Sequence, residues 1–232
     1  MTVLSACQSA SVRLFGKKPS AVFSASDPTS LKLQDLANEA ALEIAKTHDW
    51  QALTVLNTIT GDGTSTAFDL PSDYDRIPLD SSPYDVTSRA WFYAVKSLDE
   101  WLDDQVSITA GVPGVWKIIG GQLNILPALG SSKTAKFYYQ SNKIVTGSGG
   151  TNKSAFNMDD DEFRLPERLL TLGLIWMWRQ RNGLDYAADL DAYNTTLAQE
   201  VVRDKAKKKL VVGRRRYPSD VKIAFPGVIE AS

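Results

Sequence analysis

The first fifty residues show the spacing of two amphipathic helices. Leu4, Cys7, Ser11 and Leu14 follow one another at intervals of three and four, which predicts a helix over residues 3–15. A second helix is predicted to begin after Asp27, which can cap it, since a proline follows at the first helical position, where no amide hydrogen is needed. Apolar residues then repeat at helical spacing to about residue 47, namely Leu33, Leu36, Ala37, Ala40, Ala41, Ile44 and Ala45.

From residue 51 the pattern changes to that of strands and turns. β-branched residues over 54–60, the turn residues Gly61-Asp62-Gly63 and a returning stretch over 66–70 predict a hairpin. A second hairpin is predicted around Gly120-Gly121, between the strands 115–119 and 123–126, and a further strand covers 134–140. Residues 86–95 predict a strand, or a strand that leads into a short helix over 97–105, which Ser97 and Glu100 would cap together.

Helical spacing resumes at Pro166. The segment 166–181 is apolar on nearly every face, which predicts a central position among other helices or subunits. Gly183 can end this helix and Asp185 can begin the next, so that the two form an antiparallel pair. The residues that we expect in the core or between subunits are Leu172, Ile175, Trp176 and Trp178 of the first helix and Tyr186 and Tyr193 of the second.

The order of these elements favours an α+β fold, because strands precede helices in blocks and do not alternate with them. A helical bundle is expected from residues 1–50 and 166–207 together, interrupted by a β-rich insertion over 51–165. A flexible polar loop is expected near 143–162 within that insertion, and an extended C-terminal arm over 208–232.

Charge changes the interpretation of that arm. The chain has a formal net charge of −1, but residues 203–222 hold nine basic and two acidic side chains, so that the other residues carry −8. The arm also alternates apolar Val221, Ile223 and Phe225 with other residues, as a strand does. It is too apolar for a solubilising tail, so we expect it to dock on a protein surface. The candidate docking residues are Lys207, Lys208, Lys209, Arg214, Arg215, Arg216, Tyr217, Val221, Ile223 and Phe225.

Composition excludes several kinds of site. The 232 residues include one cysteine, Cys7, and one histidine, His48, which excludes an internal disulfide framework, a cysteine zinc site and a multi-histidine centre. We therefore expect no metal, no cofactor and no catalytic set. The most apolar run, 169–178, is half the length needed to span a membrane, so no membrane partner is expected.

Four local groups resemble chemical sites, but each is expected to be structural. The loop 147–154 resembles a phosphate-binding loop but has Asn152 in place of a required glycine. The acidic stretch 159–162 lacks the spacing of a calcium loop and is expected to be a solvated loop. His48 is expected to stabilise a helix end, because no nucleophile accompanies it. The carboxylates Glu39, Glu43, Asp99 and Glu100 are expected to be surface charges.

Three stretches resemble the head–tail connector (adaptor) proteins of tailed bacteriophages. They are the helix 33–50 with its ending His48-Asp49-Trp50, the stretch 68–76 that begins Phe68-Asp69-Leu70-Pro71, and the stretch 170–180 with the Gly183-Leu184-Asp185-Tyr186 that follows it. They occur in the expected order over the first 200 residues or so, while the region 80–160 matches less well.

The resemblance implies a structural function. Members of this family form a closed ring of about twelve copies below the portal, with the C-terminal arm on the portal and the insertion loops on the tail machinery. Genomic DNA passes through the centre without sequence-specific binding, and an acidic lumen would let it slide.

We therefore expect a non-enzymatic adaptor at the head–tail junction of the virion, assembled in the host cytoplasm. Its partners would be the portal ring, a tail, nozzle or stopper protein, and further copies of itself. Two alternatives remain open at this point, a tail-associated cell-wall hydrolase and a DNA-binding packaging protein.

Overall fold

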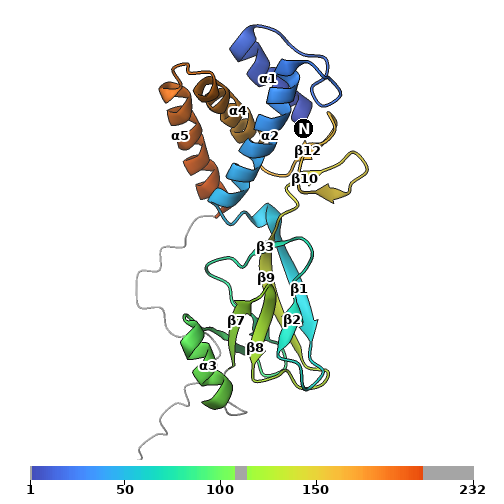
Figure 1. Cartoon of the computed structure of the whole chain (residues 1–232), viewed down its shortest axis with the longest axis vertical. Helices are drawn as coiled ribbons and strands as arrows, with labels where there is room; N and C mark the ends of the chain where they lie inside the picture. The colour runs from blue at the N-terminus through green and yellow to red at the C-terminus, as the bar shows by residue number, and fades with distance from the viewer. Residues whose placement is uncertain (1, 108–113, 206–232) are drawn as a thin grey trace, which may run out of the picture.

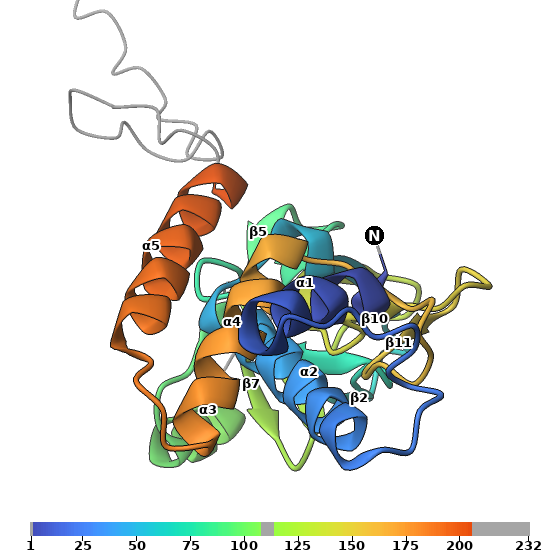
Figure 2. The ribbon, with the colours of Figure 1, turned by 90° about the horizontal axis from the view of Figure 1, so that it is seen from above.

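The computed structural model describes residues 2–107 and 114–205, and the helical and β-rich parts of the chain lie at opposite ends of it (Figure 1). The helical part consists of α1 (Val3–Phe15), α2 (Pro28–Thr47), α4 (Glu167–Arg181) and α5 (Ala187–Asp204). The α4 helix packs against the other three, and α5 lies on the opposite side of α4 from α1 and α2 (Figure 2). The prediction of a mixed α+β fold is confirmed.

Local capping explains where the N-terminal helices begin and end. Gly16 adopts a left-handed conformation with φ 68° and donates its N–H to the Val12 carbonyl at 3.0 Å, which ends α1. The carboxylate of Asp27 accepts the Ser30 N–H at 3.0 Å, and Pro28 stands at the first position of α2. The predicted end of α1 and the predicted start of α2 are therefore confirmed.

The turn between α4 and α5 follows the same rules. Gly183 has a φ of 68°, and the Leu184 N–H next to it donates to the Arg179 carbonyl at 2.9 Å. Asp185 accepts the N–H of Ala187, the first residue of α5, at 3.2 Å. The predicted helix end is thus confirmed, whereas Tyr186 and not Asp185 stands at the N-cap of α5, one residue later than predicted.

Two sheets make up most of the β-rich part. The first sheet has the strand order β1-β9-β4-β5, and β3 also pairs with β9. The second sheet has the strand order β2-β8-β7-β6. The strands of the first are β1 (Thr54–Thr60), β3 (Tyr74–Arg76), β4 (Tyr84–Asp85), β5 (Ala90–Trp91) and β9 (Thr134–Ser141). Those of the second are β2 (Ala67–Asp69), β6 (Tyr93–Ala94), β7 (Val115–Ile119) and β8 (Gln122–Leu126). A short 3-10 helix, η1 (Gln51–Leu53), leads from α2 into β1.

The hairpin at Gly120-Gly121 is confirmed, since β7 and β8 pair antiparallel and both glycines have positive φ. The short helix is also confirmed as α3 (Leu98–Ser107). The Ser97 hydroxyl accepts the Glu100 N–H at 3.0 Å, and the Glu100 carboxylate accepts the Lys96 N–H at 3.2 Å.

The predicted hairpin of 54–60 with 66–70 is wrong. β1 pairs antiparallel with β9 over its whole length, whereas β2 pairs with β8 in the other sheet. Gly61, between β1 and β2, allows the backbone to pass close to Leu129, because a Cβ at this position would lie only 2.4 Å from the Leu129 carbonyl oxygen. The Gly61 N–H donates to Lys133 at 2.8 Å and the Gly63 N–H to Leu129 at 3.0 Å, so the chain is held against the loop that precedes β9.

A third sheet lies against the helical part. It contains β10 (Val145–Thr146), β11 (Asn152–Lys153) and β12 (Glu162–Phe163), with β10 in the middle. Ile144, Val145, Phe156, Phe163 and Leu165 belong to the same buried cluster as the helices. Residues 143–162, expected as a flexible loop, thus contribute strands and core side chains here. Across the described ranges, no helix has the length and apolar character needed to cross a membrane.

Candidate functional site

The residues expected in the core or between subunits gather around α4. Leu172, Ile175, Trp178 and Tyr193 are buried within the single chain, while Trp176 and Tyr186 are partly buried. The Trp176 ring lies 6.0 Å from that of Tyr193 and 6.5 Å from that of Tyr186. The apolar faces of α4 are therefore covered by α1, α2 and α5 of the same chain.

The Tyr193 hydroxyl is buried beneath this cluster and has no hydrogen-bond partner among the described residues. Burial, followed by the charge of Glu43, raises the pKa of Tyr193 to about 12. The phenol is therefore neutral at any physiological pH and acts as an apolar body in the core.

Two of the stretches that carry the family resemblance meet where the helical part joins the β-rich part. We call residues 48–51, Arg76 and Asp204 the junction. Arg76 of β3 donates to the Asp49 carboxylate at 2.9 Å, to the adjacent Asp75 at 2.6 Å and to the His48 carbonyl at 2.8 Å. The Trp50 indole is buried and donates to the Ile44 carbonyl at 2.8 Å. One guanidinium thus ties the end of α2 to the sheet.

The end of α5 is fixed at the same place. The Asp204 carboxylate lies 3.1 Å from His48 Nε2 and accepts the Gln51 N–H at 3.1 Å. A cavity of about 390 Å³ adjoins it, lined by Trp50, Ala52, Arg164, Leu165, Pro166, Glu200, Arg203 and Asp204. His48 has the structural position that the sequence predicts, at the end of α2. The end of α5, one residue before the last described residue Lys205, is therefore held at the junction.

Loss of the Arg76 guanidinium should loosen the junction. We expect Arg76→Ala to lower the free energy of unfolding by about 2 kcal/mol, because its hydrogen bonds to two charged groups and a carbonyl are lost. Urea denaturation of the variant measures this change. Arg13→Ala, at an exposed position of α1, is the control and should have an effect below about 0.5 kcal/mol. Equal stabilities of the two variants would contradict the assigned role.

The acidic stretch is not a solvated loop, and the structure corrects that expectation. Asp161 is completely buried and accepts the N–H groups of Asn157 and Met158 at 2.8 and 3.0 Å and the Lys153 ammonium at 2.6 Å. Asp159 accepts the N–H groups of Val22 and Phe23 at 2.8 and 2.9 Å. These carboxylates organise backbone, and the described residues contain no group of three acidic, cysteine or histidine side chains able to hold a metal.

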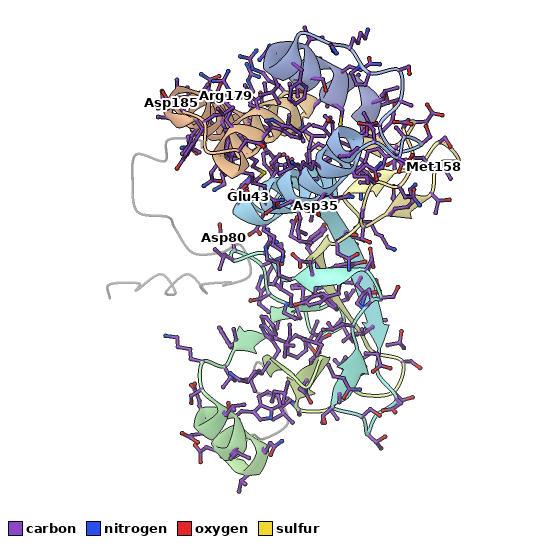
Figure 3. The ribbon with its side chains drawn as sticks, turned by 45° about the horizontal axis from the view of Figure 1, so that its top comes forward. Asp35, Glu43, Asp80, Met158, Arg179 and Asp185 are labelled. Atoms are coloured by element: carbon purple, nitrogen blue, oxygen red, sulfur yellow. The ribbon has the colours of Figure 1, made fainter. Side chains whose placement is uncertain are left out.

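The other local groups also have structural roles. Residues 147–151 form the turn between β10 and β11, and no helix follows directly after β11. The Lys153 ammonium is occupied by Asp161 and Asn157. Glu39 pairs with Arg181, and Glu43 follows one turn later on α2, labelled in Figure 3. Burial and the charge of Glu39 raise the pKa of Glu43. Asp99 and Glu100 lie on α3 at the far end of the molecule, so these carboxylates share no cleft.

One exposed apolar surface, on α3, was not predicted from the sequence. Leu98, Leu102 and Val106 of α3 are all exposed, although they follow one another at helical intervals of four. That spacing is the signal by which the sequence could have revealed an apolar stripe. The ten predicted docking residues between Lys207 and Phe225 lie outside the described residues.

Comparison with known families supports a structural adaptor role. The family model described as SU10 adaptor protein matches residues 1–221. The chain belongs to the SU10 adaptor protein family. This is a phage head–tail adaptor family, which confirms the resemblance seen in the sequence. A search of curated proteins finds no match.

Membership gives this SU10 adaptor a structural role in the virion, in contact with other head or tail proteins of the phage. The matched range includes both stretches that meet at the junction and the basic residues 207–216.

Proposed function

We propose that this SU10 adaptor is a non-enzymatic component of the head–tail junction, where about twelve copies form a ring that joins the portal to the tail and lets DNA pass. The observation that carries the proposal is the family match over residues 1–221. The apolar side chains of α4 are buried within one chain, apart from the partly buried Trp176, so the proposed ring contacts would come mainly from other surfaces. Exposed apolar side chains on the helices are available for them, namely Val12, Phe15, Leu31, Leu42 and Val202.

The C-terminal segment is the part that docks on the portal. It is basic and apolar at once, so it can add both ion pairs and buried area to a protein surface. Asp204, close before it in the chain, is held at the junction by His48 and Gln51, and a fixed attachment point would reduce the conformational freedom that docking must restrict. The β-rich part, at the opposite end from the helices, would face the tail.

The charge of the remaining chain supports passage of DNA. Outside residues 203–222 the protein carries −8, and a ring of twelve such bodies would repel phosphate from its lumen. Repulsion leaves DNA free to slide, whereas a basic lumen would retain it by ion pairing.

Imaging of portal rings mixed with the full-length protein tests the proposal. We expect a ring of adaptor subunits below each portal. Arg214→Glu, Arg215→Glu and Arg216→Glu together should lower occupancy at least tenfold, because they convert attraction into repulsion at the docking surface. The control carries three equivalent changes at exposed basic residues of the β-rich part, Lys96→Glu, Lys133→Glu and Lys136→Glu, and should bind.

The outcomes separate the parts of the proposal. Absence of any ring on portals overturns the adaptor function. Equal occupancy by the arm variant and the control overturns only the role of the arm. Tight DNA binding that falls steeply with salt and is lost in the arm variant would favour a DNA-binding packaging protein instead.

A further inference from the structure

The α3 helix lies at the tip of the β-rich part, at the far end from the helical part (Figure 1). One side of it is anchored. Trp101 is 4% exposed and packs with Val95 and Leu126, which holds α3 against β7 and β8. The helix is therefore a fixed element of the fold, and its remaining surface is presented in a defined orientation.

The neighbouring side of α3 is apolar and has no cover in the described chain. Leu98 is 58% exposed, Leu102 60% and Val106 89%. Residues four apart lie on one face of a helix, so the three side chains form a continuous stripe. Water-exposed stripes of this kind are the faces that helices bury against partners.

The same helix is strongly acidic. Its ten residues include Asp99, Glu100, Asp103 and Asp104 and no basic residue. Asp99 and Asp103 adjoin the apolar stripe, whereas Glu100 and Asp104 lie on the opposite side of the helix, because 3.6 residues make one turn. Two carboxylates beside an apolar stripe select a partner that is both basic and apolar. An acidic or purely hydrophilic partner would leave either the carboxylates or the stripe without a complement.

A segment of this chain has that chemistry. Residues 206–232 hold seven basic and two acidic side chains together with the apolar Val211, Tyr217 and Phe225. These 27 residues can span about 90 Å when extended. The longest strand of the β-rich part, β9, has eight residues and covers about 27 Å. The segment is therefore more than three times as long as this strand when it is extended.

We propose that the acidic, apolar face of α3 is a docking site for the C-terminal segment 206–232. Leu98, Leu102 and Val106 receive its apolar side chains, and Asp99 and Asp103 beside them pair with its arginines and lysines. The contact is the same whether the segment belongs to this copy or to a neighbour.

The α3 contact goes beyond the proposed function, and it competes with docking on the portal. The same side chains cannot occupy α3 and the portal at once, so the α3 contact belongs to the free adaptor and is given up on the portal. A competing contact reduces the fraction of adaptor competent to bind, and weakening it raises the apparent portal affinity by that fraction.

Disulfide trapping in the full-length protein tests the contact. The variant carries Leu102→Cys on α3 and Tyr217→Cys in the segment. The native Cys7 does not interfere, because it is fully buried and burial raises the pKa of its thiol to about 12. The control carries Leu56→Cys in place of Leu102→Cys, since Leu56 of β1 has a similar exposure of 47%.

We expect the α3 pair to form its disulfide under mild oxidation at least tenfold faster than the control pair, and 1 M salt to slow it several-fold by screening the ion pairs. Equal rates for the two pairs, or no effect of salt, would overturn the proposal. Bonds within one chain and bonds between two chains both support it, and a non-reducing gel distinguishes them.

A charge variant gives a second measurement. Asp103→Lys, introduced into the full chain with the cysteine pair, should slow trapping several-fold and raise portal affinity, with the helical content unchanged by circular dichroism. Trapping that persists without any binding to portals would overturn the portal function alone. Portal binding without preferential trapping would overturn the α3 site alone.

Discussion

Replacing Asp161 by alanine is expected to lower the free energy of unfolding by about 3–4 kcal/mol, because the change leaves a cation and two backbone donors without their acceptor. Asp161 is fully buried, accepts two backbone N–H groups and pairs with Lys153. Its own carbonyl accepts the Val3 N–H at 2.6 Å, so the loop it organises also holds the start of α1. Urea denaturation measures the loss.

The neighbouring residue provides the control. Asp160 has the same side chain and is exposed, so Asp160→Ala should change stability by less than about 0.5 kcal/mol. If the two alanine variants were equally stable, the carboxylate of Asp161 would have no structural role.

The Asp161 contribution should also depend on pH. Burial alone raises the pKa of this carboxyl, but the hydrogen bonds from Asn157, Lys153 and Met158 outweigh it and hold the pKa below its usual value. A carboxyl with a depressed pKa in the folded state stabilises the fold above its unfolded pKa, and that stabilisation is lost as pH falls through the folded value. The stability difference between wild type and Asp161→Asn should therefore shrink below about pH 4.

Replacing Gly173 by leucine is expected to cost about 3 kcal/mol, because α4 has no room for a side chain at this position. A Cβ there would lie 3.3 Å from the Ala40 Cβ and 3.8 Å from Tyr193 Cε2, and the rest of a leucine would have to push α2 or α5 away. Thermal unfolding with a two-state fit measures the loss.

Gly149→Leu is the matched control for this substitution. Gly149 has open space around its Cβ position, so the same change should be nearly neutral there. A Gly173→Leu variant as stable as the control would show that the contact between α2 and α4 is not tight.

The elements that could be predicted from the sequence are those with local causes. Asp27, Gly16 and Ser97 each act within four residues of where they stand, through hydrogen bonds that the sequence itself supplies. The hairpin at Gly120-Gly121 is local as well, because positive φ at both positions fixes the turn.

Strand pairing between distant segments could not be predicted in this way. β1 and β9 pair in register from Thr54 with Gln140 to Thr60 with Thr134, across a long stretch of intervening chain. No residue near β1 specifies β9 as its partner. Gly61 and Gly63, which follow β1, have the sequence pattern of a hairpin turn, but β1 and β2 do not pair. The burial of Asp161 was hidden for the same reason, since the groups that bind it become neighbours only when the loop folds back.

The candidate site also contains residues that could be predicted from local pattern and residues that could not. Buried positions on α4, such as Ile175 and Trp178, follow from an all-round apolar segment. The junction could not be foreseen, because His48, Arg76 and Asp204 are brought together only by the fold. The docking role of residues 207–225 stays a prediction.

The attachment of Asp204 has a mechanical consequence. A pull on the C-terminal segment is applied at Lys205, next to a carboxylate that bonds His48 and the Gln51 backbone. Through Arg76, which bonds the His48 carbonyl, the load passes to the sheet as well. Tension is thus shared between α5, the end of α2 and β3, and the last turn of α5 does not carry it alone.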